Sequence, residues 1–243
     1  MVNHIARHRF WSLALLSLAL LALVGEPVLS QDDLVPIAVP CQSATGELVP
    51  RGHFFGWAAS IAADPTDPNR VFLGEGSGLT IFDATDPASP TYEGGFSVGT
   101  GDVTAIVPVS TTAYAVNGDG LRVIDVSDPE APALSGSLDL TGTTGALAVT
   151  GSYAYVARTV DWTDGWLHAV DVSDPEHPAL LASYDTPGGA SDVSVVGDPS
   201  AGLGQAVVYV ADGDVLLMLD ASDPLTLTEL ASYEPPEPVH AAT

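Results

Sequence analysis

A phrase of the pattern Asp-x-x-Asp-Pro constrains the fold of this chain more than any other feature. Its four copies are Asp83-Ala84-Thr85-Asp86-Pro87, Asp125-Val126-Ser127-Asp128-Pro129, Asp171-Val172-Ser173-Asp174-Pro175 and Asp220-Ala221-Ser222-Asp223-Pro224. Successive Asp-Pro pairs lie 42, 46 and 49 residues apart. A self-similar period of roughly 20–50 residues is typical of proteins in which one small unit is copied and stacked. We therefore expect four copies of one structural unit.

Each copy contains four short β-type runs separated by turn residues. In the second copy the runs are residues 103–109, 113–116, 121–126 and 134–140, with Gly, Asn, Asp, Ser and Pro in the breaks. The third run is apolar on both faces, so neighbouring units must cover it on both sides. The second run of each copy carries an aromatic residue at one position, namely Phe72, Tyr114, Tyr155 and Tyr209. Four-stranded units of about 40–50 residues describe an all-β fold, the β-propeller with four-stranded blades.

The four recognisable blades are expected at residues 57–96, 102–140, 146–184 and 192–233, within a propeller region of residues 48–243. Residues 48–55 have the pattern of an orphan fourth strand, and residues 235–243 resemble the start of a further blade. Propellers often close their ring with a strand from the other terminus, because closure hides exposed sheet edges. These segments indicate an incomplete ring, part of a propeller of about six to eight blades. The alternative is a four-bladed ring, or a half ring that dimerises.

Two phrases carry a resemblance to a known family. Leu121-Arg122-Val123-Ile124-Asp125-Val126-Ser127-Asp128-Pro129 and Gly151-Ser152-Tyr153-Ala154-Tyr155-Val156-Ala157 resemble the LVIVD repeat family, exported prokaryotic proteins that are expected to form propellers. The resemblance covers about residues 54–243. It departs in the first copy, where residues 63–71 are similar to the hairpin of other propeller repeats. The resemblance implies architecture and export, and it brings no activity and no functional residues.

The N-terminal 30 residues have the pattern of a secretory signal peptide. Arg7 and Arg9 precede an apolar run from Phe10 to Val24, and Ser30 is a small residue before a cut ahead of Gln31. The run is shorter than the ~20 residues that span a membrane, although an uncleaved anchor is the alternative. We expect a secreted or cell-surface protein, with residues 31–47 as a leader before the propeller.

Cys41 is the only cysteine of the chain. An internal disulfide therefore cannot form, and a lone cysteine in an exported chain is a free thiol or half of a bridge to a missing partner. A bridge to a cysteine of a missing C-terminal segment is one form of that second alternative.

The charge of the chain excludes several classes of partner. After signal cleavage four arginines, no lysine and 30 acidic residues remain, a net charge of −26. Nucleic acid is excluded because phosphate binding needs a basic footprint, and anionic membrane surfaces are disfavoured for the same reason. The acidity favours solubility or a salt-rich habitat over a surface that collects Ca²⁺, since the carboxylates are spread out rather than clustered as ligands.

The recurring aspartates favour a structural role over a chemical one. Carboxylates in Asp-x-x-Asp-Pro can accept backbone N–H bonds ahead of a proline that fixes a turn, and recurrence in every blade argues against a unique active site. The loops at residues 117–120, 161–165 and 212–214 hint at calcium, but none completes a twelve-residue calcium loop. No cofactor, metal ligand or catalytic residue is assigned, with Ca²⁺ as the weak alternative.

A few residues are candidates for ligand binding. Asp102 and Asp192 begin first strands, which line the central channel of a propeller, and His240 lies at or next to the same register. Trp162 and Trp166 belong to a longer acidic hairpin, residues 158–166, that suits stacking of a carbohydrate or a cation. Arg122 and His168 share one register of strand three, which we interpret as an edge reached by solvent rather than a buried pocket.

The leading hypothesis is an exported, non-enzymatic binding module for an extracellular protein or carbohydrate, without membrane insertion after cleavage. An incomplete ring would also self-associate. The alternative is a propeller-scaffold hydrolase or lyase whose site at the central channel is completed by further blades. A third hypothesis is a purely structural or adhesive repeat protein. The fold does not decide among them, since propellers carry many chemistries.

Overall fold

The computed structural model describes residues 57–140, 142, 144–161, 164–201 and 205–234, all of which belong to one compact unit, Gly52–Thr243. They form sixteen strands and one short 3₁₀ helix, η2 (Pro199–Ala201). The expected signal peptide, the leader, the segments 48–55 and 235–243, and the residues Cys41, Trp162 and His240 lie outside the described residues. No helix in the described part of the chain is long and apolar enough to cross a membrane.

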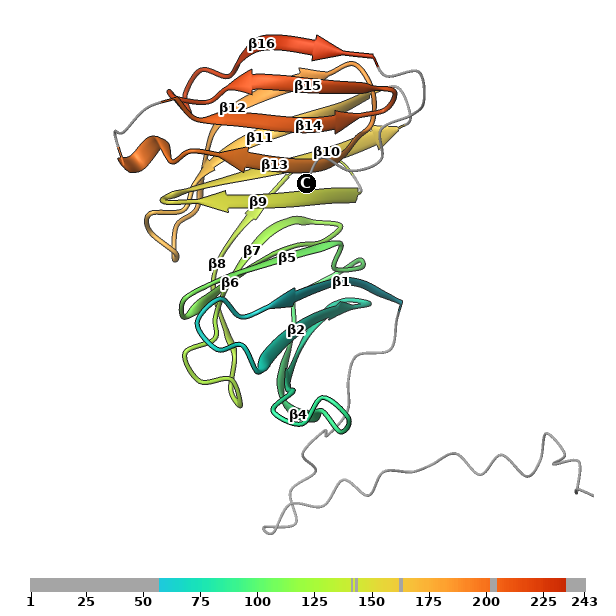
Figure 1. Cartoon of the computed structure of the whole chain (residues 1–243), viewed down its shortest axis with the longest axis vertical. Coiled ribbons are helices and arrows are strands. Elements are labelled where there is room, and N and C mark those ends of the chain that lie inside the picture. Colours follow the sequence, from blue (N-terminus) through green and yellow to red (C-terminus); the bar gives the residue numbers. More distant parts are fainter. Residues whose placement is uncertain (1–56, 141, 143, 162–163, 202–204, 235–243) are drawn as a thin grey trace, which may run out of the picture. The chain divides into compact units, whose positions relative to one another are not determined.

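The strands form four separate antiparallel sheets, each a meander in chain order (Figure 1). Blade 1 contains β1 (Ala58–Ala63), β2 (Arg70–Glu75), β3 (Gly78–Asp83) and β4 (Thr91–Ser97). Blade 2 contains β5 (Ala105–Val109), β6 (Thr112–Val116), β7 (Gly120–Asp125) and β8 (Ala133–Asp139). Blade 3 contains β9 (Thr144–Thr150), β10 (Tyr153–Asp161), β11 (Asp164–Asp171) and β12 (Ala179–Thr186). Blade 4 contains β13 (Ala190–Val196), β14 (Val207–Asp212), β15 (Val215–Asp220) and β16 (Thr228–Tyr233).

The register is the same in all four blades. The strand-two aromatic residues Phe72, Tyr114, Tyr155 and Tyr209 pair with Ile81, Val123, Ala169 and Met218 of strand three. One residue further along strand three, each blade has a register shift toward strand four. A recurring bulge bends the outer strand and increases its twist. The prediction of repeated four-stranded blades is therefore confirmed.

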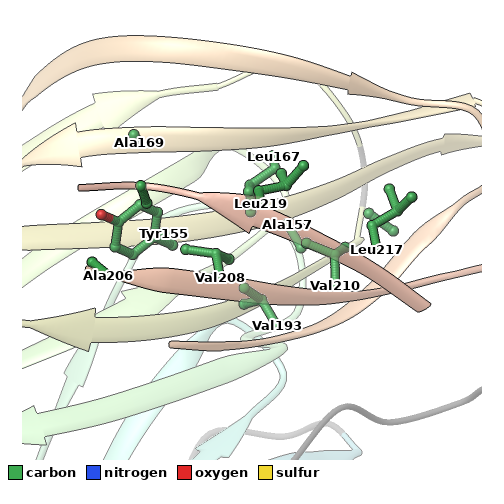
Figure 2. Close-up of a cluster of buried hydrophobic side chains, with 12 residues drawn as sticks. Tyr155, Ala157, Leu167, Ala169, Val193, Ala206, Val208, Val210, Leu217 and Leu219 are labelled. Carbon is green, nitrogen blue, oxygen red and sulfur yellow. The ribbon is translucent and has the colours of Figure 1, made fainter. Parts of the chain in front are cut away.

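Consecutive blades pack face to face through three apolar clusters. Each strand alternates its side chains between two faces, so one face contacts the preceding blade and the other contacts the following blade. We call these the backward face and the forward face. Between blades 3 and 4, for example, Tyr155, Leu167 and Ala169 of the forward face pack with Val208 and other residues of blade 4 (Figure 2).

This packing explains why strand three is apolar on both faces. In β7, Val123 belongs to the cluster shared with blade 3, whereas its neighbour Ile124 belongs to the cluster shared with blade 1, and neither side chain is exposed. Burying a side chain of this size contributes about 1.5–3 kcal/mol relative to leaving it in water. The residues that hold the stacked blades together are therefore the ones that the apolar pattern on both faces of strand three predicts from the sequence.

The Asp-Pro turns of blades 2 and 3 are packed tightly against the fourth strand of the blade before them. A Cβ atom on Gly136 in β8 would overlap the backbone oxygen of Pro175 and lie 2.8 Å from that of Glu176. A Cβ atom on Gly94 in β4 would overlap the Pro129 oxygen in the same way. Glycine at this position allows the close approach of the next blade.

The first strands of consecutive blades lie side by side, with β1 against β5, β5 against β9 and β9 against β13. Within the described ranges, blade 4 does not pack against blade 1, so the arrangement is propeller-like and the four sheets do not close into a ring. One face of blade 1 and one face of blade 4 are consequently not paired with another described blade.

Candidate functional site

The two ends of the blades carry different turns and connections. Because the strands of a meander alternate in direction, the Asp-Pro turns lie at one end, together with the turns between strands one and two. The opposite end carries the turns between strands two and three and the segments that connect one blade to the next. We call the first the Asp-Pro end and the second the connector end.

At the Asp-Pro end the Asp-x-x-Asp-Pro turn is the same in every blade, whereas the turn between strands one and two ranges from two residues in blades 2 and 3 to residues 197–206 in blade 4. The first aspartate of each phrase accepts a bond from the backbone N–H two residues on, at 2.8–2.9 Å for Asp83, Asp125, Asp171 and Asp220. The second aspartate does the same at 3.0–3.1 Å for Asp86, Asp128, Asp174 and Asp223. Hydrogen bonds from the residue two places on lower the pKa of Asp83, Asp125 and Asp220. These carboxylates are turn acceptors, as the sequence favours.

The connector end carries a buried polar residue at one equivalent position of every blade. In each blade one residue of strand two pairs with a leucine near the start of strand three. The next residue along the chain is the buried polar residue, and we call its place the latch position. Its occupants are Glu75, Asn117, Arg158 and Asp212, with exposed fractions of 7, 0, 0 and 1%. Buried polar groups of this kind need hydrogen-bond partners. Glu75 accepts a 2.9 Å bond from Thr80 Oγ1 of its own blade, whereas the partners in blades 2, 3 and 4 are largely backbone groups of turns and connecting segments.

In blade 2 the latch residue Asn117 holds the connection from blade 1. Its amide nitrogen donates to the backbone oxygens of Val98 at 3.1 Å and Thr100 at 3.0 Å. Its amide oxygen accepts from the N–H groups of Asp119 and Gly120, both at 3.1 Å. Both the donor and the acceptor group of the amide are therefore used, and together they hold the connection from blade 1 against the turn between β6 and β7.

In blade 3 the latch residue Arg158 binds two segments of blade 2. Its guanidinium donates to the backbone oxygens of Asn117 at 2.6 Å, Gly118 at 2.9 Å and Leu140 at 3.2 Å, and also to that of Gly142. Burial, opposed by the nearby Asp119 carboxylate, lowers the pKa of Arg158. The fork of guanidinium N–H groups allows one side chain to hold a turn and a connection together.

In blade 4 the latch residue is an acceptor. The Oδ2 atom of Asp212 accepts a 2.9 Å bond from the N–H of Gly188 in the connection from blade 3. The Oδ1 atom is buried and has no hydrogen-bond partner in the described part of the chain. Burial raises the pKa of Asp212, because a low-dielectric environment disfavours the carboxylate.

Arg122 is the second buried arginine of this end, and its burial corrects the sequence interpretation. We expected Arg122 and His168 at a solvent-reached edge, but their exposed fractions are only 8 and 4%. Arg122 pairs with Asp119 at 3.3 Å and with Asp139 at 3.2 Å, and its Nε donates to the Val98 oxygen at 3.2 Å. The expectation was wrong because the backward face of strand three is covered by the preceding blade.

His168 is held by its neighbours in blade 3. Its Nδ1 lies 2.8 Å from Ser183 Oγ, and its ring stacks on Trp166 with centroids 6.3 Å apart and planes 7° from parallel. Burial, with a smaller contribution from the Arg158 charge, lowers the pKa of His168 to about 4. The imidazole is therefore neutral at pH 7, and its Nε2 has no partner among the described residues.

The structure places the predicted ligand residues at the connector end of three blades. Asp102 is exposed just before β5, Trp166 is half-buried in β11, and Asp192 is half-buried in β13, where its carboxylate accepts a 2.9 Å bond from the Val193 N–H. Trp162 and His240 lie outside the described residues. The described residues contain no group of three or more His, Cys, Asp or Glu that could hold a metal ion.

Sequence reasoning missed the latch position as a feature. A comparison of the four repeats would have found it, since a polar residue follows the apolar strand-two run in every copy. Asp102, which is exposed, and Asp192, which is half-buried, lie at the same end of the blades, but the register of strand one predicts them and the latch position does not.

The fold and the latched connections define a propeller-like repeat protein. The model of the LVIVD repeat matches residues 113–140, 141–186 and 187–234, and the chain belongs to the LVIVD repeat family. No curated protein matches the chain. The crystal structure of a functionally unknown protein from Desulfotomaculum acetoxidans DSM 771 is similar at a TM-score of 0.57 and 15% identity, over 72% of this chain and 55% of that chain. The likeness supports the fold, and the chain spans about half the length of that protein.

Proposed function

We propose that this protein is an exported binding module whose ligand contacts the connector end of the blades. The comparison of the four repeats with one another carries this proposal. At the Asp-Pro end all eight aspartates make the same turn bond, which is what a purely structural feature requires. At the connector end the latch position holds a different residue in every blade.

The buried latch residues hold connections that differ in sequence and length from blade to blade, namely residues 98–104, 140–143 and 187–189. Loops presented by a rigid scaffold are where binding residues are most often found. The donor residues Asn117 and Arg158 fix the connections that precede β5 and β9, whereas the acceptor Asp212 fixes the connection that precedes β13. Asp102 and Asp192 are then presented on anchored rather than free segments.

The ligand class that this surface favours is a neutral carbohydrate. Trp166 is half-buried and stacked on His168, so its indole is held in a fixed orientation. Exposed Asp185 pairs with Trp166 across the β11–β12 register. An aromatic face beside carboxylate acceptors suits a sugar ring, which stacks through C–H groups and donates hydroxyl hydrogen bonds. A polyanionic ligand is disfavoured by the net charge of −25.

The Ser183–His168 contact does not support hydrolysis. A serine nucleophile needs a base that is itself oriented by a third group, and His168 Nε2 has no such partner in the described ranges. Serine also occupies the same register in blades 2 and 4, as Ser137 and Ser232, opposite Arg122 and Leu217. A recurrent serine without a recurrent histidine is a feature of the strand rather than of catalysis.

Binding is tested by titrating the purified protein with neutral hexasaccharides of glucose and of N-acetylglucosamine, followed by tryptophan fluorescence and calorimetry. We expect saturable binding that weakens by about tenfold or more, about 1.4 kcal/mol, in Trp166→Ala. Trp57→Ala is the matched control, because Trp57 is 88% exposed on blade 1 and has no part in the surface around Trp166. Equal affinity of Trp166→Ala and the parent protein would reject this surface.

Export is tested separately by expressing the full chain in a secreting host and sequencing the N-terminus of the product. We expect the protein outside the cytoplasm, beginning at Gln31. Retention in the cytoplasm with Met1 intact would contradict export and leave the binding test unaffected.

A further inference from the structure

The three interfaces between blades use one repeated set of positions. On the forward face these are the strand-two aromatic residue and two positions of strand three, occupied by Phe72, Leu79 and Ile81 in blade 1, by Tyr114, Leu121 and Val123 in blade 2, and by Tyr155, Leu167 and Ala169 in blade 3. All nine side chains are buried, with exposed fractions of 0–6%, and lie in the three apolar clusters.

The same positions in blade 4 have no described partner. Tyr209, Leu216 and Met218 occupy the equivalent register of β14 and β15, yet each is only half-buried and belongs to none of the three clusters. Blade 4 thus presents a complete forward face, with the same aromatic and aliphatic side chains that bury the other interfaces.

The backward face of blade 1 is equally complete. In blades 2, 3 and 4 the backward face is formed by Ala113, Ala115 and Ile124, by Ala154, Val156 and Val170, and by Val208, Val210 and Leu219, all in the clusters. The register assigns Val71, Leu73 and Phe82 to these positions in blade 1. All three are half-buried and outside the clusters, and Leu73 pairs with Ile61, which is 72% exposed.

We propose that the forward face of blade 4 binds the backward face of blade 1 in a second copy of this chain. Tyr209, Leu216 and Met218 of one copy then meet Val71, Leu73 and Phe82 of the other, as Tyr155, Leu167 and Ala169 meet Val208, Val210 and Leu219 inside the chain. The occupant is a second copy because both halves of an existing interface are present on the described blades of one chain.

Such a contact is head to tail, so it either closes into a ring or extends the array. Two copies joined at both contacts bring eight described blades together, within the range of about four to eight blades that propellers use. The net charge of −25 opposes association at low ionic strength. Salt therefore strengthens the contact, because screening reduces repulsion while the apolar faces are unaffected.

The contact is tested by measuring the mass of the purified full-chain product by light scattering over a range of concentrations and salt. We expect a species of twice the monomer mass or larger, favoured by salt. Met218→Asp removes the forward contact and Leu73→Asp removes the backward contact, and each variant alone is expected to be monomeric. The control is Leu134→Asp, since Leu134 is 47% exposed on the outer strand of an internal blade.

Mixing the two variants distinguishes this contact from other modes of association. The Met218→Asp protein retains a backward face and the Leu73→Asp protein retains a forward face, so an equimolar mixture is expected to form a one-to-one dimer. A symmetric contact between like faces would not be restored by mixing. Circular dichroism of each variant verifies folding, and the milder Met218→Ser and Leu73→Ser replace any variant that unfolds. A monomer at every concentration and salt, as when another segment of the same chain covers these faces, would overturn the proposal.

Discussion

The guanidinium of Arg158 donates a 2.6 Å hydrogen bond to the backbone oxygen of Asn117, so the latch residue of blade 3 is bonded to the latch residue of blade 2. The two residues are 41 positions apart in the chain, and each directly follows the strand-two residue that pairs with a leucine of strand three. The latch residues of blades 2 and 3 are therefore bonded directly, in addition to the apolar cluster between these blades.

Arg158→Met is expected to lower the free energy of unfolding by about 3 kcal/mol or more, because it leaves buried backbone oxygens unpaired. Arg70→Met is the matched control. Arg70 pairs with Asp64 and Glu93 at a partly exposed site, and such pairs contribute about 1 kcal/mol or less. Urea unfolding measures the free energy of unfolding of both variants. An equal loss of stability in the two would show that the Arg158 hydrogen bonds contribute no more than the partly exposed ion pairs of Arg70.

Gly136→Ala is expected to destabilise the protein by about 1–3 kcal/mol, because its Cβ would overlap the Pro175 oxygen of the next blade. Gly118→Ala is the control, since a Cβ there would meet its nearest atoms at 3.4 and 3.5 Å, which is ordinary contact. Thermal unfolding followed by circular dichroism compares the two. A Gly136 variant as stable as the Gly118 variant would mean that the blades do not approach this closely.

His168 is expected to make the protein less stable in acid. Its folded pKa of about 4 lies below the ordinary value of 6.5, so its contribution is complete above pH 6.5 and is lost as the pH falls towards 4. The difference corresponds to about 3 kcal/mol. His168→Leu removes this dependence, and Leu217 shows that leucine fits the equivalent position of blade 4, where it is 3% exposed. Urea unfolding at pH 7 and pH 4 measures the loss of unfolding free energy in the parent and in His168→Leu. An equal loss in both proteins would contradict the role of His168.

Asp212 is expected to have the opposite pH dependence. Its pKa is raised above the ordinary 3.8, so the folded protein holds this proton more tightly than the unfolded chain does. The group therefore destabilises the fold when ionised, and stability is recovered as the pH falls through the raised pKa. Asp212→Asn is expected to be more stable than the parent at neutral pH, with the difference shrinking in acid. A variant that is less stable at pH 7 would show that the charge itself is needed.

The sequence alone determined the repeat, the four strands of each unit and the turn role of the paired aspartates. These features are local. An Asx turn needs only an aspartate and the N–H two residues later, and an apolar strand with two covered faces is visible in Val123 and Ile124 without knowing what covers them. The phrase around Asp125 and Asp128 could therefore be interpreted correctly from the printed residues.

Which polar residues of the connector end are buried, and what they bind, depends on the tertiary structure. Arg122 and His168 looked like solvent-reached positions, because a period of two separates the faces of a strand without saying which face is buried most deeply. Arg158 meets Leu140 and Asn117 only when blade 3 is stacked on blade 2. Bonds between backbone groups and side chains of different blades depend on distances across the stack, and those distances are set by packing rather than by any pattern within one repeat.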